Sequence, residues 1–146
     1  MKKRSGCTLL FTILLFLCVG LLYNLIEVCW RGRTHWSMFF VGGACFVLIG
    51  NIYRKFSRFH IWVRSTVSAL AVTVVEFISG YIVNIILKLS VWDYSAMPLN
   101  IGGQVCLLYT AFWAFLSIPA GWLYRVLREK IEGISRRYHL FAPGQK

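Results

Sequence analysis

The stretch IWVRSTVSALAVTVVEFISGYIVNIIL, residues 61–87, is an almost unbroken apolar run whose charged residues are Arg64 and Glu76. An α-helix rises about 1.5 Å per residue, so about 20 apolar residues cross the hydrocarbon core of a bilayer. The stretch therefore predicts a membrane-spanning helix, and this helix decides the class of the protein.

Three further apolar runs, 8–28, 37–53 and 101–126, have a similar character. The 146 residues are 58% hydrophobic and 14% charged, with a mean hydropathy of +0.66, which is outside the usual range of soluble domains. We expect an all-α fold, an integral membrane four-helix bundle. It would be a single transmembrane domain over residues 1–146 with a basic tail at 127–146, in contact with the lipid bilayer.

The Lys and Arg residues, 16 in all, flank the apolar runs and do not line one polar surface, which argues against a nucleic-acid partner. Thirteen of them would lie on one side of the membrane, and three, Arg31, Arg33 and Lys88, on the other. Cytoplasmic loops carry the excess of positive charge. The distribution predicts a multi-pass protein of the cell (plasma) membrane with both termini in the cytoplasm.

The residues after 126 keep a helical pattern, with apolar side chains at Leu127, Ile131, Ile134 and Tyr138. Oppositely charged pairs at i,i+4, such as Arg125 and Glu129, support a continued helix. The tail is predicted to be an amphipathic basic helix. It would lie on anionic lipid or, alternatively, dock a cytoplasmic partner.

A shift of 60 residues pairs several uncommon residues of the two halves. The pairs are Gly20 with Gly80, Asn24 with Asn84, Gly42 with Gly102, Gly43 with Gly103, and Trp62 with Trp122. They are consistent with a tandem repeat of two-helix units related by an axis along the membrane normal, which would place Arg33 opposite Asp93. The alternative is that helix-packing glycines recur by accident.

Glu76 lies near the middle of the third predicted span, where a charge costs roughly 3 kcal/mol or more by insertion scales. It shares a helix face with Gly80 and Asn84, and we expect this face to point into the bundle. A protonated glutamate that bonds across helices, a carboxylate in a wet cavity, or a carboxylate that meets a cation from outside the chain all fit. Asn24 shares a face with Gly20 in the first span.

The segment VWDYSAMPLNIGG, residues 91–103, separates the last two spans. Trp92 and Tyr94 are expected to anchor it at the membrane interface, while Asp93 is solvated. Asn100 suits the N-cap of the fourth helix. Gly102 and Gly103 would then weaken its first turn and leave backbone amides open to a helix or an anion.

The sequence has no catalytic motif of the HExxH or GxSxG type, and no spacing typical of a metal or cofactor site. The five cysteines are interpreted as packing residues, with a Cys29–Cys106 disulfide as the alternative. A further alternative is an intramembrane enzyme that uses Glu76 or Asp93 as a general base on a lipid-linked substrate.

The strings Trp92-Asp93-Tyr94-Ser95 and Pro98-Leu99-Asn100, with Glu76, Gly80, Asn84 and Gly102, resemble a family of small membrane proteins classed as ABC-transporter permease, type IV, or CmpB-like. The resemblance implies a transport role. The chain carries no GxxxxGK[ST] phosphate loop, so an ATPase would be a separate protein. Four spans are few for a complete permease, which favours a homo-oligomer or a partner subunit.

The function predicted from these features is an accessory or pore-forming component of a transport system. Its polar cavity would be lined by Glu76, Asn84 and Asn100, with Asp93 attracting cations at the mouth. The alternative is a structural or sensory membrane subunit.

Overall fold

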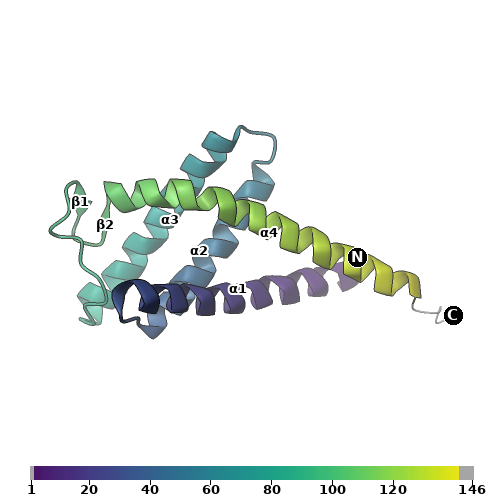
Figure 1. Ribbon diagram of the computed structural model, residues 1–146, viewed down its shortest axis with the longest axis horizontal. Coiled ribbons are helices and arrows are strands. Elements are labelled where there is room, and N and C mark those ends of the chain that lie inside the picture. Colours follow the sequence, from purple (N-terminus) through teal and green to yellow (C-terminus); the bar gives the residue numbers. More distant parts are fainter. Residues whose placement is uncertain (1, 142–146) are drawn as a thin grey trace.

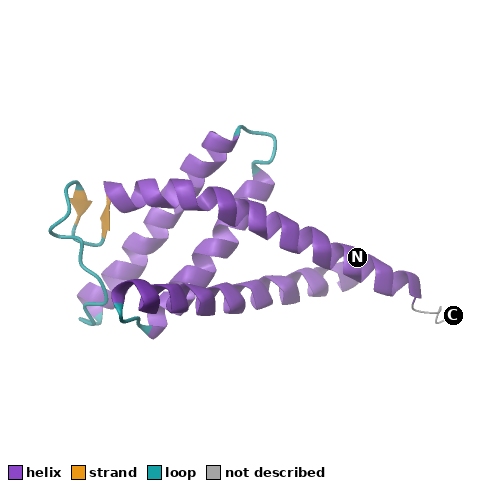
Figure 2. Ribbon diagram, in the orientation of Figure 1, coloured by secondary structure: helices purple, strands orange, loops and turns teal. Residues whose placement is uncertain are grey.

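The computed structural model describes residues 2–141 of the chain, and the side chains of residues 9–131 and 133. The order of elements is α1 (Lys2–Arg31), α2 (Trp36–Lys55), α3 (Ile61–Gly80), the π-helical η1 (Tyr81–Ile86), β1 (Asn100–Ile101), β2 (Val105–Cys106) and α4 (Leu107–Phe141). Figure 2 shows long helices and one small two-stranded hairpin. The all-α prediction is confirmed.

Four helical segments are long and apolar enough to cross a membrane. They are Leu9–Arg31, Trp36–Lys55, Ile61–Ile86 and Leu107–Ile131. Helix α2 is the most enclosed of the four, because 56% of its apolar window is buried against 17% for α1 and for α4. It packs against α1, α3 and α4, and α3 packs against α4. The core therefore forms around α2.

Local signals explain where the helices begin and end. After α1, Gly32 has a φ of 69°, which glycine adopts without strain, and its amide donates to the Val28 carbonyl (2.8 Å). His35 caps α2, since its Nδ1 accepts a hydrogen bond from the Ser37 amide (3.3 Å). The predicted starts of the second and third helices agree with the structure within one residue.

The fourth helix begins at Leu107 and not near residue 101, so the prediction that Asn100 caps it is wrong. Residues 100–106 form the β1–β2 hairpin, in which Ile101 pairs with Val105. Gly102 and Gly103 lie in its turn with φ values of 57° and 68°. That conformation cannot continue a right-handed helix, so the two glycines do not weaken a first turn of α4.

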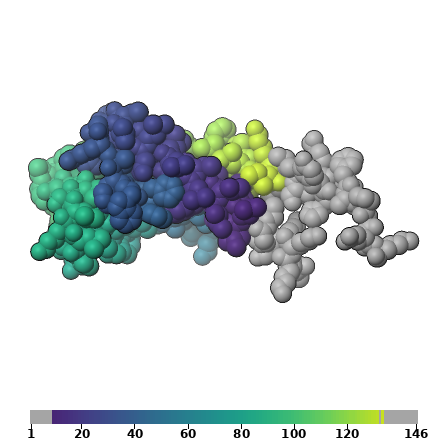
Figure 3. All heavy atoms as spheres, turned by 90° about the horizontal axis from the view of Figure 1, so that it is seen from below, coloured from purple at the N-terminus to yellow at the C-terminus, as the bar shows by residue number. Residues whose placement is uncertain are grey.

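The loop between α1 and α2 lies at the same end of the molecule as the hairpin, at the left of Figure 1. The two chain ends lie away from it. In Figure 3, residues of the α1–α2 region and of the segment after α3 lie side by side at that end. We call it the hairpin end.

Away from the hairpin end, α2 and α4 make two matching contacts. A Cβ at Gly50 of α2 would overlap the ring of Tyr124, and a Cβ at Gly121 of α4 would overlap the ring of Tyr53. The Tyr53 hydroxyl lies 3.3 Å from the Ser117 hydroxyl, and the Tyr124 hydroxyl donates to Asn51 (3.4 Å). Two Gly-x-x-Tyr segments thus pack each helix closely against the other.

The structure removes two of the residue pairs on which the predicted tandem repeat was based. Gly42 and Gly43 lie inside α2, where they allow contact with Tyr23 and Phe16, whereas Gly102 and Gly103 lie in a hairpin turn. These pairs are therefore not equivalent positions. Gly20 allows close contact with Phe39. The repeat itself stays a prediction.

Helix α4 continues through Phe141, as the pattern of the tail predicted. Arg125 and Glu129 lie 4.0 Å apart on its exposed surface. An ion pair of this kind contributes little to stability. The expected apolar positions Ile134 and Tyr138 lie outside the described side chains.

Candidate functional site

Asn84 connects the end of the third helix to the segment after it. Its Nδ2 donates to the Trp92 carbonyl and to Gln104 Oε1, both at 2.9 Å, and its Oδ1 accepts from the Val91 amide at 2.7 Å. Every hydrogen-bonding atom of this side chain is occupied within the protein. Asn84 therefore holds the loop in place at the end of the third helix.

Trp92, which was expected to anchor the segment at the membrane interface, is buried by the protein itself, since only 5% of it is exposed. Its indole donates to the Gln104 carbonyl (3.0 Å). The absence of a side chain at Gly80 makes room for this arrangement, because a Cβ there would lie 2.5 Å from Gln104 Oε1 and 3.0 Å from the Trp92 ring. Trp92 is thus an internal contact between loop and helix.

The hairpin turn is built from its own side chains. The Asn100 amide nitrogen donates to the carbonyls of Ser95 and Met97, and Asn100 Oδ1 accepts from the Gly103 amide (3.1 Å). The Tyr94 amide donates to the Gly103 carbonyl (2.7 Å). Asn100 therefore stabilises the turn and is not available to line a cavity.

Asp93 and Tyr94 have different surroundings. Asp93 is exposed, and hydrogen bonds from the Ser95 hydroxyl and amide hold the pKa of its carboxyl below the usual value. The Tyr94 ring stacks on Tyr109 of α4 at 4.5 Å between centroids, and burial raises the pKa of its phenol. Tyr94 is thus held partly by the protein, whereas Asp93 remains charged at the surface.

Glu76 lies below this loop, in the interior of the helices, with 7% of its surface exposed. The indole of Trp113 of α4 lies near its carboxyl. Neither of the ion pairs between described residues includes Glu76. The structure thus buries an acid that has no cationic partner among the described residues.

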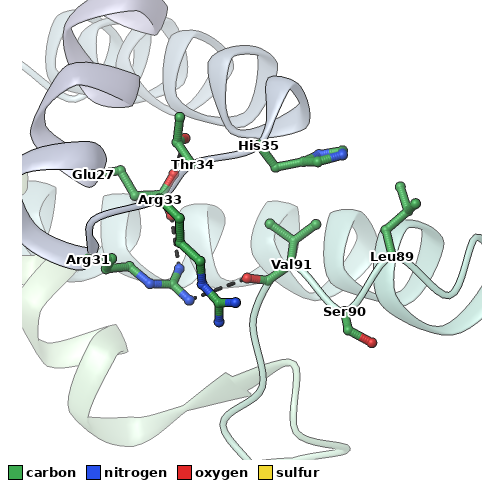
Figure 4. Close-up of a pocket in the computed structure, with 8 residues that line it drawn as sticks. All are labelled: Glu27, Arg31, Arg33, Thr34, His35, Leu89, Ser90 and Val91. Carbon is green, nitrogen blue, oxygen red and sulfur yellow. Dashed lines mark hydrogen bonds and ion pairs between the residues drawn. The ribbon is translucent and has the colours of Figure 1, made fainter.

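A second cluster of polar side chains lies at the hairpin end, between the α1–α2 connection and the segment that follows η1 (Figure 4). Arg31 donates to Glu27 (2.9 Å) and to the Val91 carbonyl (3.3 Å), and Thr34 donates to Glu27 (2.5 Å) and Asn24 (3.4 Å). Eight residues line a cavity of about 160 Å³ here: Glu27, Arg31, Arg33, Thr34, His35, Leu89, Ser90 and Val91. We call this cavity the loop pocket.

Several predicted site residues do not come together. Asp93 bonds to Ser95, and no ion pair joins it to Arg33 among the described side chains. Asn24 accepts a hydrogen bond from Thr34, whereas Asn84 bonds to Val91, Trp92 and Gln104. Cys29 and Cys106 are both free. Within residues 9–131 and 133, no three His, Cys, Asp or Glu side chains are grouped as a metal site would need.

Sequence reasoning missed Gln104, Trp113 and the loop pocket. Gln104 is a polar residue within an apolar run of the sequence, and this pattern could have identified it. The structure buries it, and buried polar groups need hydrogen-bond partners. Trp113 has an indole N–H that needs a partner when buried, but its pairing with Glu76 depends on how α3 and α4 pack. The loop pocket is formed by segments about 60 residues apart, so no local sequence pattern predicts it.

Comparison with known proteins gives one family. A model of the family described as "Putative ABC-transporter type IV" matches residues 14–142. No solved structure matches the chain. The matched range includes Glu76, Asn84, the hairpin and the loop pocket.

Proposed function

The chain belongs to the "Putative ABC-transporter type IV" family, and from this premise we propose that it is an accessory or pore-forming membrane subunit without ATPase activity of its own. The family and the four apolar helices make it a membrane protein associated with transport. ATP hydrolysis would come from a separate subunit, because the sequence contains no phosphate-binding GxxxxGK[ST] loop.

The exposed surfaces of α1 and α4 are rich in large apolar side chains, including Leu14, Leu21, Phe112 and Phe115. Such surfaces face lipid or another subunit. We propose that they contact the bilayer of the plasma membrane and, over part of their area, a second copy of the chain or a transporter subunit.

We propose that both termini are cytoplasmic and that the hairpin end faces outward, on the support of the Lys and Arg distribution. Cys29 is exposed near the hairpin end, and Ser57 is exposed between α2 and α3. In a background in which the other cysteines are replaced by serine, a membrane-impermeant maleimide should label Cys29 in intact cells. In the variant Ser57→Cys, with Cys29 also replaced by serine, it should label the new cysteine only after permeabilisation. The opposite pattern would invert the proposed topology.

The observation that carries the proposed function is the burial of Glu76 in the protein interior, without a cationic partner from the described part of the chain. Isolated ionisable groups in spans mark ion or proton pathways. We propose that Glu76 is the functional centre and binds a proton or a transported cation. Asn84 and Asn100 would position the outer loop above it, and Asp93 would add negative charge at the surface.

Glu76→Gln keeps the shape of the side chain and removes its charge and its titration. We expect proton flux into proteoliposomes, followed with an entrapped pH-sensitive dye, to fall at least tenfold. The matched control is Glu129→Gln, which makes the same change at an exposed position of α4 and should leave the flux unchanged. Equal fluxes in Glu76→Gln and the unmodified protein would remove this proposal.

A structural subunit is the second candidate, and one observation favours it. Asn84 and Asn100, which were expected to line a cavity, are instead occupied by hydrogen bonds within the loop. If Glu76→Gln changes the thermal unfolding midpoint and not the flux, Glu76 serves helix packing and the structural function stands.

A further inference from the structure

The loop pocket carries more positive than negative charge. Two arginines line it, with Glu27 as the one acidic residue among its eight lining side chains. The Glu27 carboxylate is already neutralised by Arg31 and accepts a hydrogen bond from Thr34. The remaining positive charge is that of Arg33. The pocket therefore favours an anion over a cation.

Arg33 is the residue available to a ligand. No hydrogen bond or ion pair of Arg33 occurs among the described residues, whereas Arg31 is engaged with both Glu27 and Val91. Figure 4 shows the side chains of Arg31 and Arg33 both directed toward the segment that contains Val91. A guanidinium presents five N–H donors in a planar fork that suits bidentate contact with oxyanions.

The N-terminus of α2 adds to this charge. His35, which lines the pocket, is the N-cap of this helix of 20 residues. The amides of Ser37 and Met38 in the first turn already donate to His35, so the helix end contributes through the partial positive charge of its dipole, which attracts anions. The arginine, the helix end and the cavity are independent features that favour the same kind of ligand.

The size and location of the pocket narrow the class of ligand that it can bind. A volume of about 160 Å³ holds on the order of ten water-sized positions, which is enough for a tetrahedral phosphate group with adjoining atoms. Trp30 and Trp36 flank the connection between α1 and α2 and are 86% and 62% exposed, as is typical of aromatic residues at the membrane interface. In the proposed topology, these two residues place the pocket at the depth of lipid headgroups.

We propose that the loop pocket binds a phosphate group, with Arg33 as its principal cationic contact. The group is that of an anionic lipid or of inorganic phosphate. The inference uses the proposed function only to place the pocket on the outer side. Binding is measured on purified protein, so its failure would leave the transport role standing, and the failure of that role would leave the pocket.

The test has two arms, both with the full chain. In detergent, the thermal unfolding midpoint is measured against inorganic phosphate, with chloride added to matched ionic strength. In nanodiscs, it is measured in phosphatidylcholine with and without phosphatidylglycerol. We expect a rise in at least one arm. A rise with phosphatidylglycerol alone identifies a lipid headgroup, and a rise with inorganic phosphate identifies a site open to the free ion.

Arg33→Gln should weaken the apparent affinity at least tenfold, because it removes a charge-assisted fork at an exposed position that the fold does not need. The matched control is Arg58→Gln, which removes the same charge from the exposed connection between α2 and α3. It should leave the affinity unchanged. The proposal is overturned if neither arm shows a rise, or if Arg58→Gln loses as much affinity as Arg33→Gln.

Discussion

Asn84→Ala is expected to lower the free energy of unfolding by roughly 3 kcal/mol and to release the segment between α3 and the hairpin. The change removes three hydrogen bonds, each worth about 0.5–1.5 kcal/mol. It also leaves Gln104, which is buried, without the donor to its Oε1. Denaturant unfolding in bicelles would measure the loss of stability.

Hydrogen exchange would locate this loss. The Val91 amide, which donates to Asn84 in the unmodified protein, should exchange much faster in the variant. The control is Asn51→Ala, which makes the same substitution but removes a single bond of 3.4 Å from Tyr124 and should cost less than about 1 kcal/mol. If the two variants lose similar stability, Asn84 does not hold the loop.

Gly50→Leu is expected to destabilise the protein by about 3 kcal/mol or separate α2 from α4, which is the second large effect. Even the first carbon of the new side chain would overlap the Tyr124 ring. That ring cannot easily move, because it is 3% exposed and packs against Phe11 and Phe46. Overpacking of a core typically costs 1–3 kcal/mol, and more where the neighbour is rigid.

The thermal unfolding midpoint of the purified protein measures this effect. Gly133→Leu is the matched control, since a Cβ at Gly133 meets no atom within 4 Å and leucine is a better helix former than glycine. It should be neutral or stabilising. The double variant Gly50→Leu with Tyr124→Ala should lose less stability than the sum of the single variants. Additive losses would contradict a direct Gly50–Tyr124 contact.

The hairpin before α4 illustrates why hydropathy misplaced one boundary. Residues 101–106 contain Ile101, Val105 and Cys106, and a short apolar run is equally compatible with a strand and with a helix. The positive φ values of Leu99, Gly102 and Gly103 turn the chain into a hairpin. Glycine pairs permit this conformation without requiring it, because their sequence is also common at helix contacts.

The candidate site was predicted in part. Gly80 and Asn84 were predicted to share a helix face, and both lie against Gln104. Trp92 was predicted at the interface because an aromatic residue between two spans is common there. Its burial depends on the space beside Gly80 and on Gln104, which come together only when the hairpin packs against α3.

By itself, the sequence determined the four apolar helices, the starts of the second and third, and the burial of an acid within one of them, because these follow from composition and period along a single element. Tertiary structure decided that Asn84 holds a loop, that Gly50 and Gly121 each receive a tyrosine from the other helix, and that Arg33 faces a pocket. These features are contacts between segments far apart in the chain. Their geometry depends on how whole helices pack, and no local pattern encodes it.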